Sequence, residues 1–253
     1  MNELQSIPIA QEAPAGTSRA PAPRLQAERV SKRFDNRMVL RPLDLTLAPG
    51  ERVALFGANG AGKTTLLRIL ATLARPTTGR ILIETVPVER DARRARRALG
   101  VVAHQPYLYD DLTAEENLRF FARMYDVPEA ERRIEQVLGL VGLRARSGDR
   151  VHTFSRGMQQ RLAMGRAILH QPAVLLFDEP DTGLDREGMR LLQRLIGEHA
   201  AAGGSVLLTT HDLRFGLGCA DRVLLLAQGR LTLDAPVDAV DERQLDQRLA
   251  VPS

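Results

Sequence analysis

The amino-acid sequence predicts an α/β domain that has a parallel sheet, helices on both faces of that sheet, and a helical insertion. Three observations lead to this prediction. Short apolar runs of strand length alternate with segments of helical periodicity over most of the chain. A glycine-rich loop joins one of these runs to the helix that follows it. A polar stretch of helical periodicity, at about residues 106–154, interrupts the alternation.

The expected elements follow from this alternation. Residues 1–24 carry prolines among Ala, Ser, Thr and Gln, which predicts a flexible tail outside the fold. Strands are expected at residues 25–34, 39–47, 53–56, 80–83, 101–103, 174–177, 205–210 and 222–226. Helices are expected directly after the glycine-rich loop, in an arginine-rich segment near 90–98, and at 157–170 and 186–200. We expect one domain at residues 25–240 and a C-terminal tail at 241–253.

The insertion has its own helix signals. Thr113, followed three residues later by Glu116, fits a capping box at the start of a helix. Pro128 can start a second helix, because proline is favoured in the first helical turn. We therefore expect a helical subdomain within an otherwise α/β domain.

Charge and composition exclude several classes of protein. The chain is 44% hydrophobic and 26% charged, with a net charge of +4, as in an ordinary globular protein. The densest basic cluster, at residues 90–97, alternates with alanines in a predicted helix. It is typical of a solvated helix face rather than of a nucleic-acid surface, so we expect no nucleic-acid partner.

Cysteine content indicates a reducing compartment, and the hydropathy pattern bears on membrane spans and signal sequences. Cys219 is the only cysteine, so an intramolecular disulfide is impossible. No run approaches 18 consecutive apolar residues, so no membrane span is expected. The first residues include Glu3 and lack a continuous apolar core, unlike a secretory signal.

The glycine-rich loop at residues 57–65 reads GANGAGKTT and fits the phosphate-loop pattern G-x-x-x-x-G-K-[ST]. Its residues are Gly57, Ala58, Asn59, Gly60, Ala61, Gly62, Lys63, Thr64 and Thr65. Glycines let backbone N–H groups turn toward an anion, and the following helix adds the positive end of its dipole. Lys63 can reach the outer phosphates, and the Thr64 hydroxyl can ligate the Mg²⁺ that accompanies a nucleotide.

A second motif, AVLLFDEP at residues 173–180, delivers two carboxylates to the end of an apolar strand. Ligands of open α/β sheets bind at the carboxyl ends of strands. Asp178 is placed to hold Mg²⁺, and Glu179 can accept a proton from the water that attacks a terminal phosphate. The alternative is that the two carboxylates merely open a loop.

Two more polar residues follow predicted strands. Gln105 follows the strand at 101–103, where its amide can contact the metal or orient water. His211 follows the strand at 205–210 in the same way. Either residue alone is more often structural, and their arrival at the ends of successive predicted strands favours a functional role.

An aromatic residue and a helix start complete the candidate residues. Phe34 lies on a strand entering the nucleotide site, where it can stack on an adenine ring or simply belong to the core. Ser155 can cap the helix that begins near Gly157, and that helix N-terminus can face an anion. From the residues alone, Ser155 and the helix that follows it indicate only a capped amphipathic helix.

In their order, these motifs resemble the nucleotide-binding subunit of an ABC transporter. The ordered set consists of Phe34, GANGAGKTT, Gln105, FSRGMQQRL, LLFDEP, TGLD at residues 182–185, and His211. The resemblance covers about residues 25–233. It implies a P-loop fold of the ABC ATPase type, with a mainly parallel central sheet, an antiparallel β subdomain and a helical insertion subdomain.

The resemblance also implies a role for each matching residue. Phe34 becomes the adenine-stacking aromatic, Gln105 the coupling glutamine, Glu179 the general base, Asp185 a link between the two sites, and His211 the γ-phosphate contact. Two subunits would sandwich each ATP between the phosphate loop of one and the Ser155 and Gly157 segment of the other. The partner would be a second copy or a second ATPase subunit.

Two features are more specific. In the usual LSGGQ signature, this chain has Phe154, Arg156 and Met158 in place of Leu, Gly and Gln, which puts the strength of the phosphate contact in question. Residues 104–125 resemble the ATP-binding subunit of the cytochrome c biogenesis transporter, whose family role is haem export or handling. In that segment Tyr107 and Tyr109 would meet a membrane permease, or would be packing residues.

The expectation is an ATP hydrolase that uses ATP and Mg²⁺, is cytoplasmic and peripheral on the inner face of the cell membrane, and drives export by separate integral membrane permease subunits. Haem is the expected cargo, and a drug, lipid or polysaccharide is the alternative. A non-transport ABC ATPase acting on ribosomes or DNA, and a nucleotide-regulated binding protein without turnover, are rivals from other classes.

Overall fold

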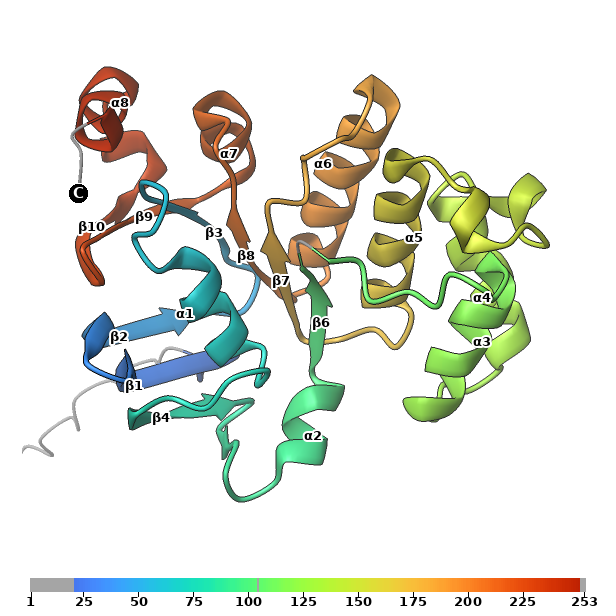
Figure 1. Cartoon of the computed structure of the whole chain (residues 1–253), viewed down its shortest axis with the longest axis horizontal. Helices are drawn as coiled ribbons and strands as arrows, with labels where there is room; N and C mark the ends of the chain where they lie inside the picture. The colour runs from blue at the N-terminus through green and yellow to red at the C-terminus, as the bar shows by residue number, and fades with distance from the viewer. Residues whose placement is uncertain (1–20, 104, 251–253) are drawn as a thin grey trace, which may run out of the picture.

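The computed structural model describes residues 21–103 and 105–250 (Figure 1). Most of the predicted N-terminal tail, His104 and the last three residues of the predicted C-terminal tail lie outside this range. The antiparallel sheet lies at one end of the molecule and a group of helices lies at the other, with the larger sheet between them (Figure 1).

The larger sheet has six strands in the order β10-β9-β3-β8-β7-β6. Its strands are β3 (Arg52–Phe56), β6 (Leu99–Val102), β7 (Val174–Asp178), β8 (Ser205–Thr209), β9 (Arg222–Ala227) and β10 (Arg230–Pro236). All neighbours pair in parallel except β10, which runs antiparallel to β9.

The smaller sheet is antiparallel, in the order β2-β1-β4-β5. Its strands are β1 (Leu25–Phe34), β2 (Arg37–Leu47), β4 (Thr78–Ile83) and β5 (Val86–Pro87).

The helices of the described residues fall into a group around the sheets and a group in the insertion (Figure 1). They are α1 (Lys63–Leu70), α2 (Ala92–Arg97), α3 (Ala114–Met124), α4 (Ala130–Leu140), α5 (Arg156–Ile168), α6 (Arg186–Ala201), α7 (Leu213–Cys219) and α8 (Glu242–Ala250), with short 3₁₀ turns at Arg144–Arg146, Val151–Thr153 and Val237–Ala239. Among residues 21–103 and 105–250, no helix combines the length and the apolar composition that a bilayer span requires.

Alternation along the central strands divides the core into two layers. On β7, Leu175 and Phe177 pack with α5, α6 and the helical subdomain, whereas Val174 and Leu176 pack with α1 and the antiparallel sheet. Successive side chains of a strand point to opposite faces, so a strand that is buried on both sides must be apolar throughout. This explains the continuous apolar run before Asp178.

The fold class predicted from the sequence is confirmed. The capping box is also present, because the Thr113 hydroxyl accepts from the Glu116 N–H and the Glu116 carboxylate accepts from the Thr113 N–H. One boundary was wrong: α4 starts at Ala130, with Glu129 rather than Pro128 at its N-cap position.

Four helices and strands were not predicted: the two-residue strand β5, α7, β10 and α8. The segment that we expected to be a C-terminal tail contains α8, and Leu245 on this helix is buried against Phe56 and Val223. Apart from Leu245 and Leu249, the helix is mostly charged or polar, so it has only a narrow apolar face. A narrow apolar face gives little helical periodicity, so the sequence pattern did not predict this packed helix.

The contact between β6 and α5 leaves no room for a side chain at Gly100. A Cβ at that position would lie 2.3 Å from the Ala167 carbonyl oxygen and 2.6 Å from Leu175 Cδ2. We expect Gly100→Ala to lower the free energy of unfolding by about 1–3 kcal/mol, because the strand and helix must separate. Urea unfolding followed by circular dichroism measures this change.

Gly197 is the matched control, since it lies inside α6 and a Cβ there would meet nothing within 4 Å. Gly197→Ala should raise stability by about 0.5–1 kcal/mol, through the higher helix propensity of alanine. Equal effects at the two positions would contradict the close packing of β6 on α5.

Candidate functional site

The phosphate loop follows β3 and leads into α1. Two of its glycines, Gly57 and Gly62, are required by close approach as well as by conformation. A Cβ at Gly57 would lie 2.4 Å from the Leu226 carbonyl oxygen, and a Cβ at Gly62, whose φ is 109°, would lie 2.8 Å from Leu40 Cδ2. The loop therefore keeps backbone N–H groups accessible at the N-terminus of α1, which favours an anion.

Lys63 lies within this loop and is only 7% exposed. Its Nζ donates to the carbonyl oxygens of Gly57, at 2.6 Å, and Ala58, at 3.3 Å. Burial lowers the pKa of Lys63, and the nearby carboxylates of Asp178 and Glu179 act in the opposite direction. The ammonium group is thus held where phosphate oxygens would meet it.

The carboxylates at the end of β7 lie beside the loop. Asp178 Oδ1 accepts from the Thr64 hydroxyl, at 3.4 Å, and from the Thr209 hydroxyl, at 2.9 Å. Glu179 Oε1 lies 2.8 Å from His211 Nε2. The structure therefore brings together five of the predicted site residues: Lys63, Thr64, Asp178, Glu179 and His211.

Thr209 was missed from the sequence, although it holds both carboxylate-bearing residues. Besides its bond to Asp178, its Oγ1 accepts from the Glu179 N–H at 3.1 Å, and the residue is fully buried. Glu179 itself has a φ of 52°, in the left-handed region, so its side chain departs from the strand direction. A polar residue ending the apolar run of β8 was the signal available in the sequence.

The segment at residues 155–158 starts α5 and packs against residues 182–185. Ser155 Oγ caps the helix by accepting from the Met158 N–H at 3.2 Å. A Cβ at Gly157 would lie 3.2 Å from the Gly183 carbonyl oxygen, and the Arg156 side chain packs over Gly183. Asp185 likewise caps α6, because its Oδ1 accepts from the Gly188 N–H at 2.7 Å. Two helix starts with predicted functional residues therefore lie side by side.

Two predicted residues lie apart from the carboxylate cluster. Phe34 is half exposed at the end of β1, with Lys32 Nζ 4.8 Å from its ring centroid. Gln105 is exposed after β6, and no hydrogen bond within the described residues joins its side chain to Asp178 or Glu179. Its neighbour Pro106 lines a small hollow together with Glu179, Arg156 and Gln160.

The donor set near the loop fits Mg²⁺. Within residues 21–103 and 105–250 there is no group of three or more His, Cys, Asp or Glu side chains that could hold a metal ion. Mg²⁺ does not need one, because it is bound through one or two protein oxygens together with phosphate and water. Thr64 Oγ1 and Asp178 Oδ1, at 3.4 Å from each other, supply hard oxygen donors at the phosphate loop.

Comparisons with known proteins agree with this geometry. The family described as "ABC transporter" matches residues 40–182. The chain is 35% identical to the uncharacterized ABC transporter ATP-binding protein YdbJ of Bacillus subtilis (strain 168), covering 87% of this chain and 71% of that protein. It is 32% identical to the linearmycin resistance ATP-binding protein LnrL of the same strain, covering 82% and 67%. It is 36% identical to the Nod factor export ATP-binding protein I of Paraburkholderia xenovorans (strain LB400), covering 83% and 70%.

Solved structures give the same result. An ATP-binding subunit of an ABC transporter superposes with a TM-score of 0.81 at 32% identity, over 90% of this chain and 95% of that one. The ATP-binding cassette MJ0796, a dimer in a post-hydrolysis state bound to ADP and Pi, superposes with a TM-score of 0.75 at 26% identity, over 84% and 98%. The names of YdbJ, LnrL and the Nod factor export protein do not support the narrower resemblance to a cytochrome c biogenesis subunit.

Asp181, beside this site, gives a test of stability against pH. Its Oδ2 accepts from the Thr210 hydroxyl at 2.8 Å, and its Oδ1 is buried without a hydrogen-bond partner among the described residues. Burial raises the pKa of Asp181, against the opposing effect of the Thr210 hydroxyl. The unfolded state therefore ionises first as the pH rises, and the folded state loses stability between the ordinary Asp pKa and the raised one.

We expect Asp181→Asn to remove this loss. The variant should be more stable than the wild type at pH 8, with a higher Tm, because the wild-type carboxylate is then ionised in a buried site. The difference should shrink as the pH falls through the raised pKa toward the ordinary value for Asp. Thermal melts at pH 5 and pH 8 measure it, with the exposed Asp238→Asn as control. A gain that is independent of pH would contradict the role of ionisation.

Proposed function

Because this chain belongs to the ABC transporter family, in which it is an ATP-binding and ATP-hydrolysing subunit, we propose that it powers export through separate membrane-spanning subunits. The observation that carries the proposal is the cluster of Lys63, Thr64, Asp178, Glu179 and His211 at one edge of the sheet. This set combines a phosphate cradle, a metal-binding carboxylate and a general base.

The phosphate groups of ATP would lie on the loop at residues 57–65. Lys63 Nζ now donates to two loop carbonyls, and it can donate to the outer phosphate oxygens from the same position. Phe34 would stack on the adenine ring, since its exposed face lies at the end of a strand that enters the site.

Glu179 would act as the general base. Its carboxylate accepts a proton from water as the water oxygen bonds to the γ-phosphorus, while the bond to the bridging oxygen breaks and ADP leaves. His211, at 2.8 Å from Glu179 Oε1, would orient that carboxylate and contact the γ-phosphate. The His211 side chain is 53% exposed and that of Glu179 is 24% exposed, so water can reach both groups.

Thr64, Asp178 and Gln105 would hold Mg²⁺, which neutralises charge on the phosphate oxygens when bound. A 2.9 Å hydrogen bond from the Thr209 hydroxyl holds the Asp178 carboxylate in place for this role. Gln105 would reach the metal or the attacking water from the end of β6, the outer parallel strand.

A second copy of the chain would complete each site. Ser155, Gly157 and Asp185 lie at two adjacent helix starts. Within the described residues, no hydrogen bond joins the side chains of Ser155 and Asp185 to the phosphate loop of the same chain. Helix N-termini attract phosphate, so these residues fit the ATP held by a partner. The dimeric neighbour bound to ADP and Pi supports this arrangement.

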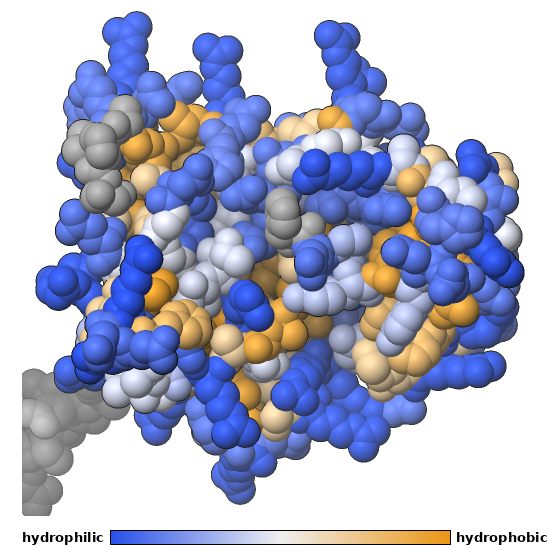
Figure 2. Space-filling model, in the orientation of Figure 1, coloured by the Kyte–Doolittle hydropathy of each residue, from blue (hydrophilic) through white to orange (hydrophobic). Residues whose placement is uncertain are grey.

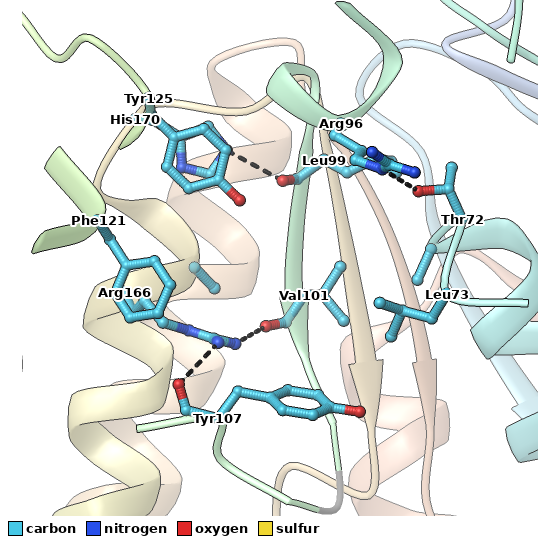
Figure 3. Close-up of a pocket in the computed structure, with 12 residues that line it drawn as sticks. Thr72, Leu73, Arg96, Leu99, Val101, Tyr107, Phe121, Tyr125, Arg166 and His170 are labelled. Atoms are coloured by element: carbon cyan, nitrogen blue, oxygen red, sulfur yellow. Dashed lines mark hydrogen bonds between the residues drawn. The ribbon is translucent and has the colours of Figure 1, made fainter. Parts of the chain in front are cut away.

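The membrane partner would bind at the helical subdomain. Exposed aromatic and apolar side chains gather there, and Figure 2 shows apolar surface over this part of the molecule. Tyr109 packs edge-on against Phe120, with ring centroids 4.9 Å apart, and Met124 is also exposed. Beside them lies a pocket of about 210 Å³ lined by Leu73, Tyr107 and other residues (Figure 3). Exposed apolar patches of this kind mark protein interfaces.

The proposed cargo is a drug, a lipid or a polysaccharide, and the proposed location is the inner face of the cell membrane. The names of two relatives, for linearmycin resistance and Nod factor export, support an exporter. Haem remains the competing cargo, through the resemblance of residues 104–125. A role on ribosomes or DNA is the competing function.

Glu179→Gln tests the base. The substitution keeps the shape and removes the proton acceptor, so we expect kcat to fall by about 10²–10⁴-fold while ATP binding is retained. Phosphate release and equilibrium dialysis measure the two quantities, and size-exclusion in ATP should show a trapped dimer. Glu187→Gln, an exposed change in the first turn of α6, is the control. Unchanged turnover in Glu179→Gln would exclude Glu179 as the base.

Phe120→Ser tests the membrane partner. This change on the exposed aromatic surface should reduce recovery of the permease by about 10-fold or more in a pull-down from native membranes in mild detergent. Leu140→Ser, an exposed change on α4, should leave recovery unchanged. Mass spectrometry and a haem absorption spectrum identify the partner and cargo. Cytochrome-biogenesis subunits would support haem, and ribosomal proteins in place of a permease would overturn the transport function.

A further inference from the structure

Arg166, on α5, is a buried arginine whose charge meets no carboxylate among its described hydrogen bonds. Its side chain is aimed at main-chain oxygens (Figure 3). Nη2 donates to the Val101 carbonyl at 2.6 Å, and Nη1 donates to the Tyr107 carbonyl at 3.3 Å. The residue is only 9% exposed.

Two aromatic rings enclose the same guanidinium. Its Cζ lies 5.2 Å from the ring centroid of Phe121 and 5.8 Å from that of Tyr107. Cation–π contacts and carbonyl bonds offset part of the cost of burying a charge. An apolar side chain would fill this space without that cost, so the position calls for the directional bonds that only the guanidinium fork makes.

Those two carbonyls lie on either side of Gln105 in the chain. Val101 is in β6, four residues before Gln105, and Tyr107 is two residues after it. Arg166 therefore ties both ends of the short segment that carries Gln105 to one point on α5. The Gln105 side chain itself makes no hydrogen bond within the described residues, so its position depends on how its backbone is held.

The same helix also carries the segment proposed to contact the partner's ATP. α5 starts directly after Ser155, whose hydroxyl caps it, and Arg166 lies about three turns further along. A rigid helix therefore joins the helix start at Ser155 to the segment around Gln105.

We propose that Arg166 is a positioning residue that holds the Gln105 segment in register with α5, so that the segment and the helix start at Ser155 move as one body. The proposal rests on the function proposed above. Arg166 touches neither ATP nor metal, and it acts through Gln105.

Arg166→Met tests the proposal, since methionine fills much of the space without the fork. Arg133→Met is the matched control. Arg133, on α4, is half-buried and likewise donates to two carbonyls, those of Ile168 at 2.8 Å and Leu169 at 3.0 Å, but it makes no hydrogen bond to the Gln105 segment. Hydrogen exchange of the peptide at residues 103–109 is the first readout, because it needs no ATP. We expect exchange to rise by about 10-fold in Arg166→Met and to stay unchanged in Arg133→Met.

Kinetics are the second readout. Arg166→Met should lower kcat by about 10-fold and leave KM for ATP within about 2-fold, because the phosphate loop is intact. In a Gln105→Ala background, Arg166→Met should cause no further loss, since the two residues act through one path. Unchanged exchange in Arg166→Met, or an equal loss in both backgrounds, would overturn the proposal.

Arg166→Lys is a second variant that separates a folding defect of Arg166→Met from a loss of positioning. It keeps the charge and can bond one carbonyl but not both. We expect intermediate exchange and intermediate kcat in this variant, and wild-type values of both would overturn the proposal. Failure of the parent function is distinct: a wild type that hydrolyses no ATP would remove the proposed function, and hydrogen exchange would still decide the role of Arg166.

Discussion

The parallel pairing of β3, β8, β7 and β6 is the constraint on which the candidate site depends. Parallel strands end at the same edge of a sheet, and each of these four strands is followed by a predicted site residue or loop. The register is specific as well, because Asp178 pairs with Thr209 across β7 and β8. A slip of one residue would turn Asp178 toward the other face and separate it from Thr64.

That register is itself fixed by burial on both faces of the sheet. Leu175 and Phe177 belong to the core layer of α5 and α6, and Leu176 belongs to the layer of α1. With only one core layer, the opposite face of the strand could carry polar residues. With a layer on each face, the residues of β7 before Asp178 must be apolar, so the charged residues come where the strand ends. The edge that carries the candidate site is thus positioned by two hydrophobic cores, and the Thr209 hydrogen bonds then orient its carboxylates.

The sequence allowed the fold class and the phosphate loop to be predicted because both are local signals. A P-loop is a run of adjacent residues, and the carboxylates at Asp178 and Glu179 follow directly on their strand. Thr209 was missed although it visibly ends the apolar run of β8, because its role depends on which strand lies beside β7. α8 was hidden because two leucines among charged residues give little periodicity, and its burial depends on Phe56, which lies far earlier in the chain. The structure brings some of the predicted site residues together, and the roles of all of them, Phe34, Gln105, Ser155 and Asp185 included, remain predictions.

Few residues of this chain bear directly on which molecule is transported. Residues 104–125 suggested haem, and in the structure this segment contributes Tyr107, Tyr109, Phe120 and Met124 to an exposed surface. On the proposal that a permease docks at this surface, similarity in the segment reports on the shape of that permease and not on the cargo. The ATP site, in turn, recognises phosphate and adenine, which are common to all such transporters. A resemblance at either place therefore identifies the machinery of the subunit and not the transported molecule.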